Sequence, residues 1–381
     1  MSRFGSNTNK KIDEIIEANQ PKNTLSNKRF VWKTFMEFCN VRKYEIDENR
    51  TVEELALILK DWAINMRKRD GSDFKETTIK TMWNLTSKIL QIKYYKDYKV
   101  IIDPFKSVVF QQARAARDSI RRILQSDACK RKQSSVALSS IELSKMINFW
   151  NENTPEGLQR KFYHIAAVEL AWRGGEASAC LTDFFHTETN NDDSLTNRIE
   201  YNPIFSKTCQ GGSGFCTDSK YLVKNNDTNV CPVRLFKKLI SKRGSNIKSK
   251  RLFMRPNRYW KKETDHWYDN MPIGKNIIQN WTKSTAEAIG LNTKEKKITN
   301  HSNRSTAVSR LLKNGVQEQE LIKITGHNNT NSIKPYLNID LEHHNKIINS
   351  MRGNKACVVE TNTSGSSFNF SNCSFVNCTF K

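Results

Sequence analysis

Apolar residues recur at helical spacing along the first third of the chain, separated by polar positions that face solvent. Residues 51–66 are the clearest case, because Thr51 and Glu54 form the pattern of a capping box in front of an amphipathic stripe. The helices expected here cover residues 24–39, 51–66, 77–90 and 105–125. The pattern predicts a small all-α lobe.

The remainder of the chain mixes helical and extended patterns. Cys129–Ser135 is basic and aperiodic, which indicates a linker. Residues 198–207 have the character of a strand, and the glycine-rich run 210–214 follows as a turn. The further helices expected are one beginning at Ser139 with Glu142 and those over 161–172, 231–239, 274–291, 304–313 and 317–325. The fold class predicted is mainly α with a small β-sheet.

We therefore expect four regions along the chain. They are a helical lobe (1–128), a linker (129–136), a larger α+β lobe (137–352) and a tail (353–381). The tail repeats Phe, Asn and Cys every five residues within Ser366–Lys381. Two and a half repeats cannot bury a core of their own, so we expect the tail to pair with a sheet edge of its own chain or of a neighbour.

The balance of charge points to a polyanionic partner. The 381 residues include 62 Lys and Arg against 39 Asp and Glu, a net charge of +23, and the excess is shared almost equally by the two lobes. Nucleic acid is the leading candidate, ahead of ribosomal, chromatin or membrane-surface partners. A hydrophobic content of 37% excludes a disordered chain, and no run of 18 apolar residues predicts a membrane span.

The cysteines give no sign of a metal site. Nine cysteines are scattered without any C-x-x-C pair, and no histidine lies at zinc-finger spacing from one of them. An odd number of cysteines without a signal peptide indicates reduced thiols inside a cell. We expect no metal and no cofactor, and the basic segment Cys129–Ser135 is compatible with import into the nucleus.

Basic side chains near one face of the helix expected over 105–125 are candidates for contacts with DNA phosphates. The alternative is an ordinary solvated surface, and the net charge brings the two interpretations close to even. The candidate DNA-binding residues are Arg114, Arg117, Arg121 and Arg122 in that helix and Lys130, Arg131 and Lys132 in the linker.

The residues that carry chemistry are spread over the larger lobe. Arg173 follows the most apolar helix, and Glu176 lies three residues beyond it. A phosphodiester is the group that fits two arginines, two histidines, a lysine and a tyrosine without a carboxylate pair for metal. The arginines would stabilise a pentavalent transition state, and a tyrosine can hold the phosphate in a covalent link. The catalytic candidates are Arg173, Lys207, His301, Arg304, His327 and Tyr336.

The order of these residues resembles that of the tyrosine recombinase, or phage-integrase, family. The finer resemblance is to recombinases of Crypton DNA transposons and to related domains of zinc finger MYM-type proteins. It rests on Lys207–Gly212, Cys231–Phe236, Trp267–Lys275, Asn300–Arg304 and the Phe/Asn/Cys tail. The resemblance implies a helical core-binding domain of SAM-like type and an α+β catalytic domain that close around DNA as a C-shaped clamp.

The resemblance also implies a role for each candidate. Arg173, His301, Arg304 and His327 would bind the scissile phosphate, Lys207 would be the general acid, Tyr336 would form a 3′-phosphotyrosine, and Glu176 would support Arg173. It implies duplex DNA as partner, a homotetramer built from dimers, location in the nucleus, and no metal, cofactor, small-molecule or membrane partner. The expected activity is site-specific DNA recombination or integration.

Two positions depart from the family pattern, and two other functions stay open. Pro335 precedes Tyr336 and is expected to place the tyrosine at the start of a helix. The long gap after Arg173 leaves Lys220 as a second candidate for the general acid. A domesticated DNA-binding or chromatin-associated protein would keep this fold without catalysis. A type IB topoisomerase would share the chemistry but act as a monomer.

Overall fold

The structure is a computed structural model that describes residues 5–131, 133–189, 195–203, 220–327, 329–337 and 341–352. The chain divides into two compact units, Met1–Ser134 and Ser135–Lys381. This division falls within the range expected for the linker. Lys132, Lys207, the turn 210–214 and the tail 353–381 lie outside the described residues.

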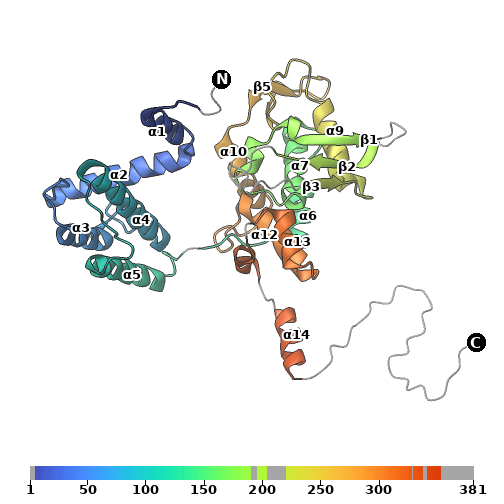
Figure 1. The fold of residues 1–381 in the computed structure, drawn as a ribbon. Coiled ribbons are helices and arrows are strands. Elements are labelled where there is room, and N and C mark those ends of the chain that lie inside the picture. The colour runs from blue at the N-terminus through green and yellow to red at the C-terminus, as the bar shows by residue number, and fades with distance from the viewer. Residues whose placement is uncertain are drawn as a thin grey trace, which may run out of the picture. The chain divides into compact units, whose positions relative to one another are not determined.

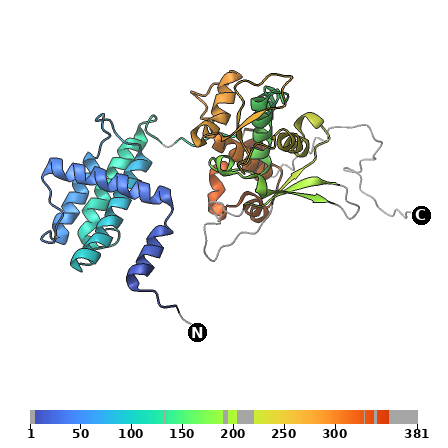
Figure 2. The ribbon, with the colours of Figure 1, turned by 90° about the horizontal axis from the view of Figure 1, so that it is seen from above.

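The first unit is helical throughout its described part (Figure 1, Figure 2). Its α-helices are α1 (Asn9–Ala18), α2 (Lys22–Arg42), α3 (Val52–Asn65), α4 (Glu76–Lys93) and α5 (Gln111–Ser126). A π-helix (η1, Tyr94–Tyr98) extends α4, and a 3-10 turn (η2, Val108–Phe110) precedes α5. Phe35, Trp62 and Trp83 are at most 1% exposed and form the centre of the core. The predicted all-α lobe is confirmed.

The capping box predicted at Thr51 is present at the start of α3. The Glu54 backbone N–H donates to Thr51 Oγ1 at 3.2 Å, and the Thr51 N–H donates to Glu54 Oε2 at 2.9 Å. Two N–H groups that an α-helix cannot satisfy internally are thereby bonded. The same arrangement of Ser139 and Glu142 begins α6 in the second unit.

The second unit builds its main core around helix α7. Its α-helices are α6 (Ser140–Asn148), α7 (Pro155–Glu169), α8 (Glu176–Ala179), α9 (Pro232–Ser241), α10 (Lys275–Gln279), α11 (Trp281–Ala288), α12 (Asn300–Lys313), α13 (Glu318–Thr325) and α14 (Leu341–Met351). Its 3-10 turns are η3 (Thr182–Phe184), η4 (Thr228–Val230), η5 (Thr330–Ser332) and η6 (Lys334–Tyr336). Helix α7 packs against α6, α9 and α12, so most of its residues are buried.

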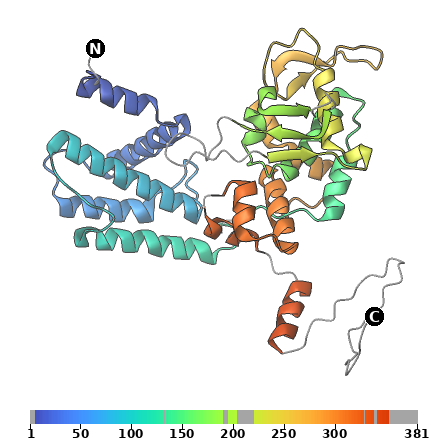
Figure 3. The ribbon, with the colours of Figure 1, turned by 45° about the vertical axis from the view of Figure 1, so that its right-hand side comes forward.

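Two small antiparallel sheets complete the second unit (Figure 3). One has the order β1 (Phe185–Thr189), β2 (Leu195–Tyr201) and β3 (Lys220–Val223), and the other pairs β4 (Met254–Pro256) with β5 (Tyr268–Pro272). Ile199 and Leu222 face each other across β2 and β3 and are fully buried, which anchors the sheet to the core. The strand expected over 198–207 corresponds to β2, which begins earlier and ends at Tyr201.

The single helix expected over 274–291 is wrong, because the chain forms α10 and α11 with a break at Asn280. In a continuous helix the Thr282 N–H would donate to the Ile278 carbonyl. Here the buried side chain of Asn300 forms hydrogen bonds with both of these backbone groups. Its Oδ1 accepts from Thr282 at 3.2 Å, and its Nδ2 donates to Ile278 at 2.8 Å. A residue distant in sequence therefore divides the helix.

Candidate active site

His301 and Arg304 lie three residues apart near the start of α12, on one face of the helix. The helix begins at a capping box in which the Thr299 hydroxyl accepts from the His301 N–H at 3.2 Å and the Ser302 hydroxyl accepts from the Thr299 N–H at 3.1 Å. This cap fixes the first turn, so both side chains leave the helix in a defined direction.

Arg304 is the buried centre of the site, with only 1% of its surface exposed. Its Nη1 donates to the Ala171 carbonyl at 2.6 Å, and its Nη2 lies 3.2 Å from His327 Nε2. Burial, and then the charge of Arg173, lowers the pKa of Arg304 to about 10, so the guanidinium is charged at neutral pH. Because a carbonyl and an imidazole carry no negative charge, these two partners do not neutralise the buried guanidinium, and it still attracts an anion.

The segment after α7 supports the site through its main chain. Ala171 adopts a left-handed conformation, with φ of 48°, which is costly for a residue that carries a Cβ. This conformation turns the Ala171 carbonyl toward Arg304, while the preceding carbonyl, of Leu170, accepts from Lys220 Nζ at 2.7 Å. Two basic side chains are thus tied to consecutive carbonyls.

Arg173 lies two residues further along and is held by three hydrogen bonds to two residues. Its Nη1 donates to Glu176 Oε1 at 3.0 Å, and its backbone N–H donates to Glu176 Oε2 at 2.9 Å. Its Nη2 donates to the Gly326 carbonyl. Glu176 therefore supports Arg173 as predicted from the sequence, and the side chain of Arg173 stays 22% exposed.

His327 is the second residue after α13, and the residue between them, Gly326, caps the helix in the left-handed conformation at φ of 68°. Its ring lies between two partners, because Nδ1 is 2.6 Å from Thr325 Oγ1 and Nε2 is 3.2 Å from Arg304 Nη2. Burial, followed by the charges of Arg304 and Arg173, lowers the pKa of His327 to about 4. The imidazole is therefore neutral at physiological pH.

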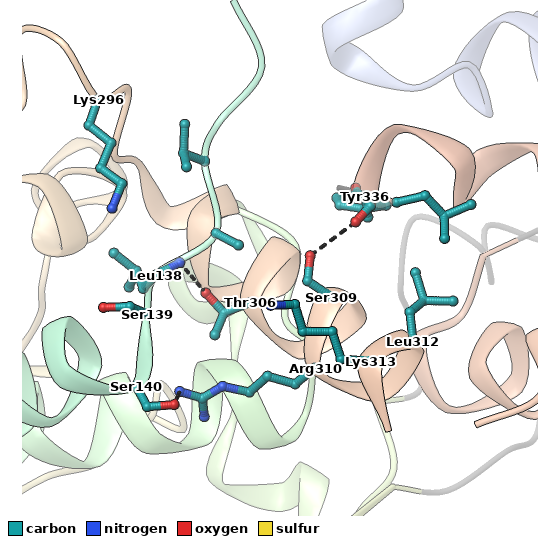
Figure 4. A pocket seen from close by; sticks show the side chains of 13 residues that line it. Leu138, Ser139, Ser140, Lys296, Thr306, Ser309, Arg310, Leu312, Lys313 and Tyr336 are labelled. Atoms are coloured by element: carbon teal, nitrogen blue, oxygen red, sulfur yellow. Dashed lines mark hydrogen bonds between the residues drawn. The ribbon is translucent and has the colours of Figure 1, made fainter. Parts of the chain in front are cut away.

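Tyr336 is the last residue of η6 and is half-buried. Its Oη lies 2.9 Å from His301 Nε2, and its ring centroid is 5.6 Å from that of His327. Its carbonyl accepts from Ser309 Oγ at 3.1 Å, which ties the turn to α12 beside a cavity of about 430 Å³ (Figure 4). The phenol thus lies against one histidine and close to the other.

Pro335 lies at the start of the short 3-10 helix η6 and Tyr336 follows it in the same turn, in line with the expectation that the proline places the tyrosine at a helix start. The 3-10 turn is closed by Tyr336 N–H to the Ile333 carbonyl at 2.8 Å and by Leu337 N–H to the Lys334 carbonyl at 3.1 Å. Neither bond needs an N–H at position 335, so the proline fits within the turn.

The structure brings Arg173, His301, Arg304, His327 and Tyr336 together, with Glu176 behind Arg173. Lys207 lies outside the described residues. Lys220 begins β3, and its charge contributes to the lowered pKa of His327, so this second candidate lies near the site.

Three of the arginines predicted to contact DNA make contacts within the first unit. Arg114 donates to the Pro104 and Ser107 carbonyls, and Arg121 pairs with Glu76 at 3.1 Å. Arg117 pairs with Asp118 and lies over the Trp83 ring, 4.7 Å from its centroid. Arg122 is exposed.

The two linker residues within the described part also have partners. Lys130 pairs with Asp73, and Arg131 donates to the Gln125 carbonyl. DNA contact by any of the arginines and lysines proposed from the sequence stays a prediction.

Sequence reasoning missed the groups that act through the main chain. Lys220 is held by the carbonyl of Leu170, Arg304 by that of Ala171 and Arg173 by that of Gly326. Because every residue has a carbonyl, the residue type does not reveal these partners. Thr325 was visible as the residue before Gly326-His327, but no role was predicted for it from the sequence.

The arrangement can bind and activate a phosphate. Two guanidiniums and an imidazole converge near a phenol, and guanidiniums match oxyanions in charge and geometry. The phenol is a nucleophile that contacts a proton acceptor and lies beside fixed positive charge. This is the arrangement needed for transfer of a phosphoryl group to the phenol oxygen.

Among the helices of the described residues, none has both the length and the apolar character of a membrane span.

The fold that positions these residues, mostly helical with small antiparallel sheets, is similar to the two-domain fold of tyrosine recombinases. A family model described as "Domain of unknown function (DUF3504)" matches residues 183–286. No curated protein shows significant similarity to the sequence.

The similar solved structures include the Tn1549 transposon integrase in two complexes. With transposon right end DNA its TM-score is 0.51, at 15% identity over 90% of this chain and 98% of that chain. With circular intermediate DNA the TM-score is 0.50, at 16% identity over 87% and 94%. A lambda integrase dimer bound to a COC′ core site has a TM-score of 0.49, at 13% identity over 92% and 96%.

Proposed function

We propose that this protein is a DNA recombinase or integrase that cleaves and rejoins duplex DNA through a covalent bond between Tyr336 and a 3′ phosphate. The observation that carries the proposal is the contact of Tyr336 Oη with His301 Nε2 at 2.9 Å, beside the buried guanidinium of Arg304. The similar integrase of known structure was solved with transposon end DNA, which supports duplex DNA as the substrate.

In this reaction the Tyr336 oxygen attacks phosphorus while the bond from phosphorus to the 5′ oxygen breaks. His301 accepts the phenol proton at Nε2, and a lysine gives a proton to the leaving 5′ oxygen. Arg173 and Arg304 stabilise the negative charge that builds up on the non-bridging oxygens. Attack by a 5′ hydroxyl on the phosphotyrosine reverses these steps and rejoins the strand without ATP.

We propose further that a Crypton-like mobile element encodes this protein and that it acts in the nucleus as a homotetramer. The support is the set of motifs at Lys207–Gly212, Cys231–Phe236, Trp267–Lys275 and Asn300–Arg304. The DNA that flanks the coding region is then the natural substrate to test.

Trapping of the covalent intermediate tests the proposal. Duplexes that carry the flanking DNA and a nick beside each possible cleavage site would be incubated with the full chain and analysed on denaturing gels. We expect a protein–DNA adduct with the wild type and none with Tyr336→Phe, while both proteins bind the duplex equally. Binding without any adduct would favour a domesticated DNA-binding protein. Relaxation of arbitrary supercoiled plasmid by monomers would favour a topoisomerase.

The identity of the general acid gives a first prediction. The resemblance assigns the proton on the leaving oxygen to Lys207, and Lys220, which donates to the Leu170 carbonyl, is the second candidate. Lys207→Ala should cleave an ordinary substrate at least 100-fold more slowly, and a substrate with a 5′ sulfur at the leaving position should restore the rate, because a thiolate leaves without a proton. If the sulfur rescues Lys220→Ala and not Lys207→Ala, the assignment is reversed.

A further inference from the structure

The last residue of α13, Thr325, is fully buried and its hydroxyl lies between two partners. Oγ1 is 2.6 Å from the Leu321 carbonyl oxygen and 2.6 Å from His327 Nδ1. A threonine hydroxyl has one hydrogen, and a carbonyl oxygen can only accept. The hydrogen is therefore committed to Leu321, and a lone pair of Oγ1 faces the imidazole. Nδ1 of His327 must carry a hydrogen.

The other ring nitrogen gives the same result independently. Nε2 of His327 lies 3.2 Å from Arg304 Nη2, and a guanidinium has donors but no acceptor. Nε2 must therefore offer a lone pair. Both contacts assign one neutral tautomer, with the hydrogen on Nδ1 and the acceptor on Nε2.

We propose that Thr325 is a positioning residue that fixes the tautomer and the ring orientation of His327, so that Nε2 accepts a hydrogen bond from Arg304. The effect of Thr325 on cleavage rests on the proposed function. Thr325 touches no reacting atom in this arrangement. It acts through the imidazole, which in turn orients the guanidinium plane that would bind the phosphate.

The charges around the imidazole keep it in this form. His301 and Arg304 face it from α12, Arg173 from the segment after α7, Lys220 from β3, and the Tyr336 ring from η6. The cationic members of this set disfavour a proton on Nε2. A bound phosphodiester brings a negative charge, which favours that proton. His327 is thus an acceptor before DNA binds, and only its protonated form can donate to a phosphate oxygen.

Nuclear magnetic resonance of the DNA-free protein tests the tautomer directly. Histidine labelled with ¹⁵N in the full chain gives seven imidazoles, and loss of one set of signals in His327→Gln assigns the ring. We expect the Nδ1–H form in the wild type. We expect the same form in Thr325→Ser, which keeps the hydroxyl, and changed ring shifts in Thr325→Val, which keeps the shape of the side chain.

Single-turnover cleavage supplies the second readout. Thr325→Val should cleave about 10- to 100-fold more slowly and with a shifted pH profile, while Thr325→Ser stays within about threefold of the wild type. Thr34→Val is the matched control, because Thr34 makes the same bond to the carbonyl four residues earlier, at 2.9 Å, without a histidine. It should leave the imidazole signals unchanged.

Two results would overturn the inference. One is an Nε2–H tautomer in the wild type, and the other is a Thr325→Val spectrum identical to that of the wild type. Because the spectra need no DNA, they stand apart from the adduct experiment. Absence of an adduct together with the Nδ1–H form would reject the proposed reaction and retain the role of Thr325.

Discussion

Buried or half-buried charged residues in the site are oriented by neighbours that are themselves fixed. Arg304 is held by the Ala171 carbonyl and His327, and Arg173 by Glu176 and the Gly326 carbonyl. A guanidinium bonded on two sides loses little further freedom when a phosphate arrives. Donors held in place in this way stabilise the charge that develops in the transition state, because they do not have to reorient during the reaction as water would.

Glu176 gives a prediction at this scale. Glu176→Ala removes both bonds to Arg173, and Glu176→Gln keeps an oxygen acceptor but removes the charge. We expect cleavage to fall about 100-fold in the first variant and about 10-fold in the second, with DNA binding changed less than twofold, because the arginine stays present but loses its orientation. Quenched-flow cleavage and fluorescence anisotropy measure the two quantities.

The control for this pair is Glu287→Gln. Glu287 forms an exposed ion pair with Lys283 at 3.7 Å in α11, and we expect no change in cleavage. Equal rates for Glu176→Ala and the wild type would show that Arg173 does not need this support.

Helices and turns determine where the chemical groups end up. The cap at Thr299 directs His301, the left-handed residue Ala171 directs a carbonyl, and the 3-10 turn that ends in Tyr336 directs the phenol. Most helices of the first unit follow from the apolar spacing of the sequence, because each buries one continuous stripe.

Other elements depend on partners that are distant in sequence. The break between α10 and α11 requires Asn300, and Arg117 and Arg121 lie where they contact Trp83 and Glu76. Residue types and spacing predicted five residues that the structure brings together, since guanidinium, imidazole and phenol have few roles together. They could not give the main-chain partners, because any residue offers a carbonyl.

The cap of α3 gives a prediction at the scale of one element. Thr51→Ala removes the hydroxyl that accepts from the Glu54 N–H and should lower the stability of the first turn by about 1 kcal/mol. Hydrogen exchange followed by mass spectrometry should show faster exchange at the start of α3. Thr51→Ser retains the acceptor and should exchange like the wild type. Unchanged protection in Thr51→Ala would mean that packing alone holds this turn.

The net charge of +23 sets how the whole molecule should bind DNA. In a plot of the logarithm of DNA affinity against the logarithm of salt concentration, each phosphate contact contributes about −0.9 to the slope. Six or more contacts therefore lower the affinity about 10³-fold or more between 50 and 200 mM salt. We expect Arg122→Gln, at an exposed position, to reduce the slope by about one. Anisotropy titrations measure the slope.

Arg117→Gln is the informative comparison, because its side chain lies over Trp83 and pairs with Asp118. We expect it to lower the stability of the first unit and to leave the slope unchanged. A reduced slope in Arg117→Gln would show that this arginine exchanges its partner for phosphate.

Two neutral histidines make stability depend on pH. Burial lowers the pKa of His164 to about 3, and burial with nearby arginines lowers that of His327 to about 4. Below the unfolded pKa of about 6.5, the unfolded chain binds protons that the folded chain excludes, so the free energy of unfolding falls as pH falls. Each histidine contributes about 1.4 kcal/mol per pH unit.

Urea unfolding followed by tryptophan fluorescence at pH 7.5, 6.5, 5.5 and 5.0 checks this. We expect a progressive decrease in the midpoint as pH falls below 6.5, and a shallower decrease in His327→Gln. A flat profile down to pH 5.0 would show that both rings take up protons in the folded protein.

The carbonyls that hold Lys220, Arg304 and Arg173 also decide how the site tolerates mutation. Leu170, Ala171 and Gly326 contribute oxygen atoms that every amino acid possesses. Exchange of the Leu170 side chain therefore leaves its bond to Lys220 in place, so an alanine scan would score that position for packing alone. Part of the support of this site therefore depends on the path of the backbone, and substitution of single side chains does not easily remove it.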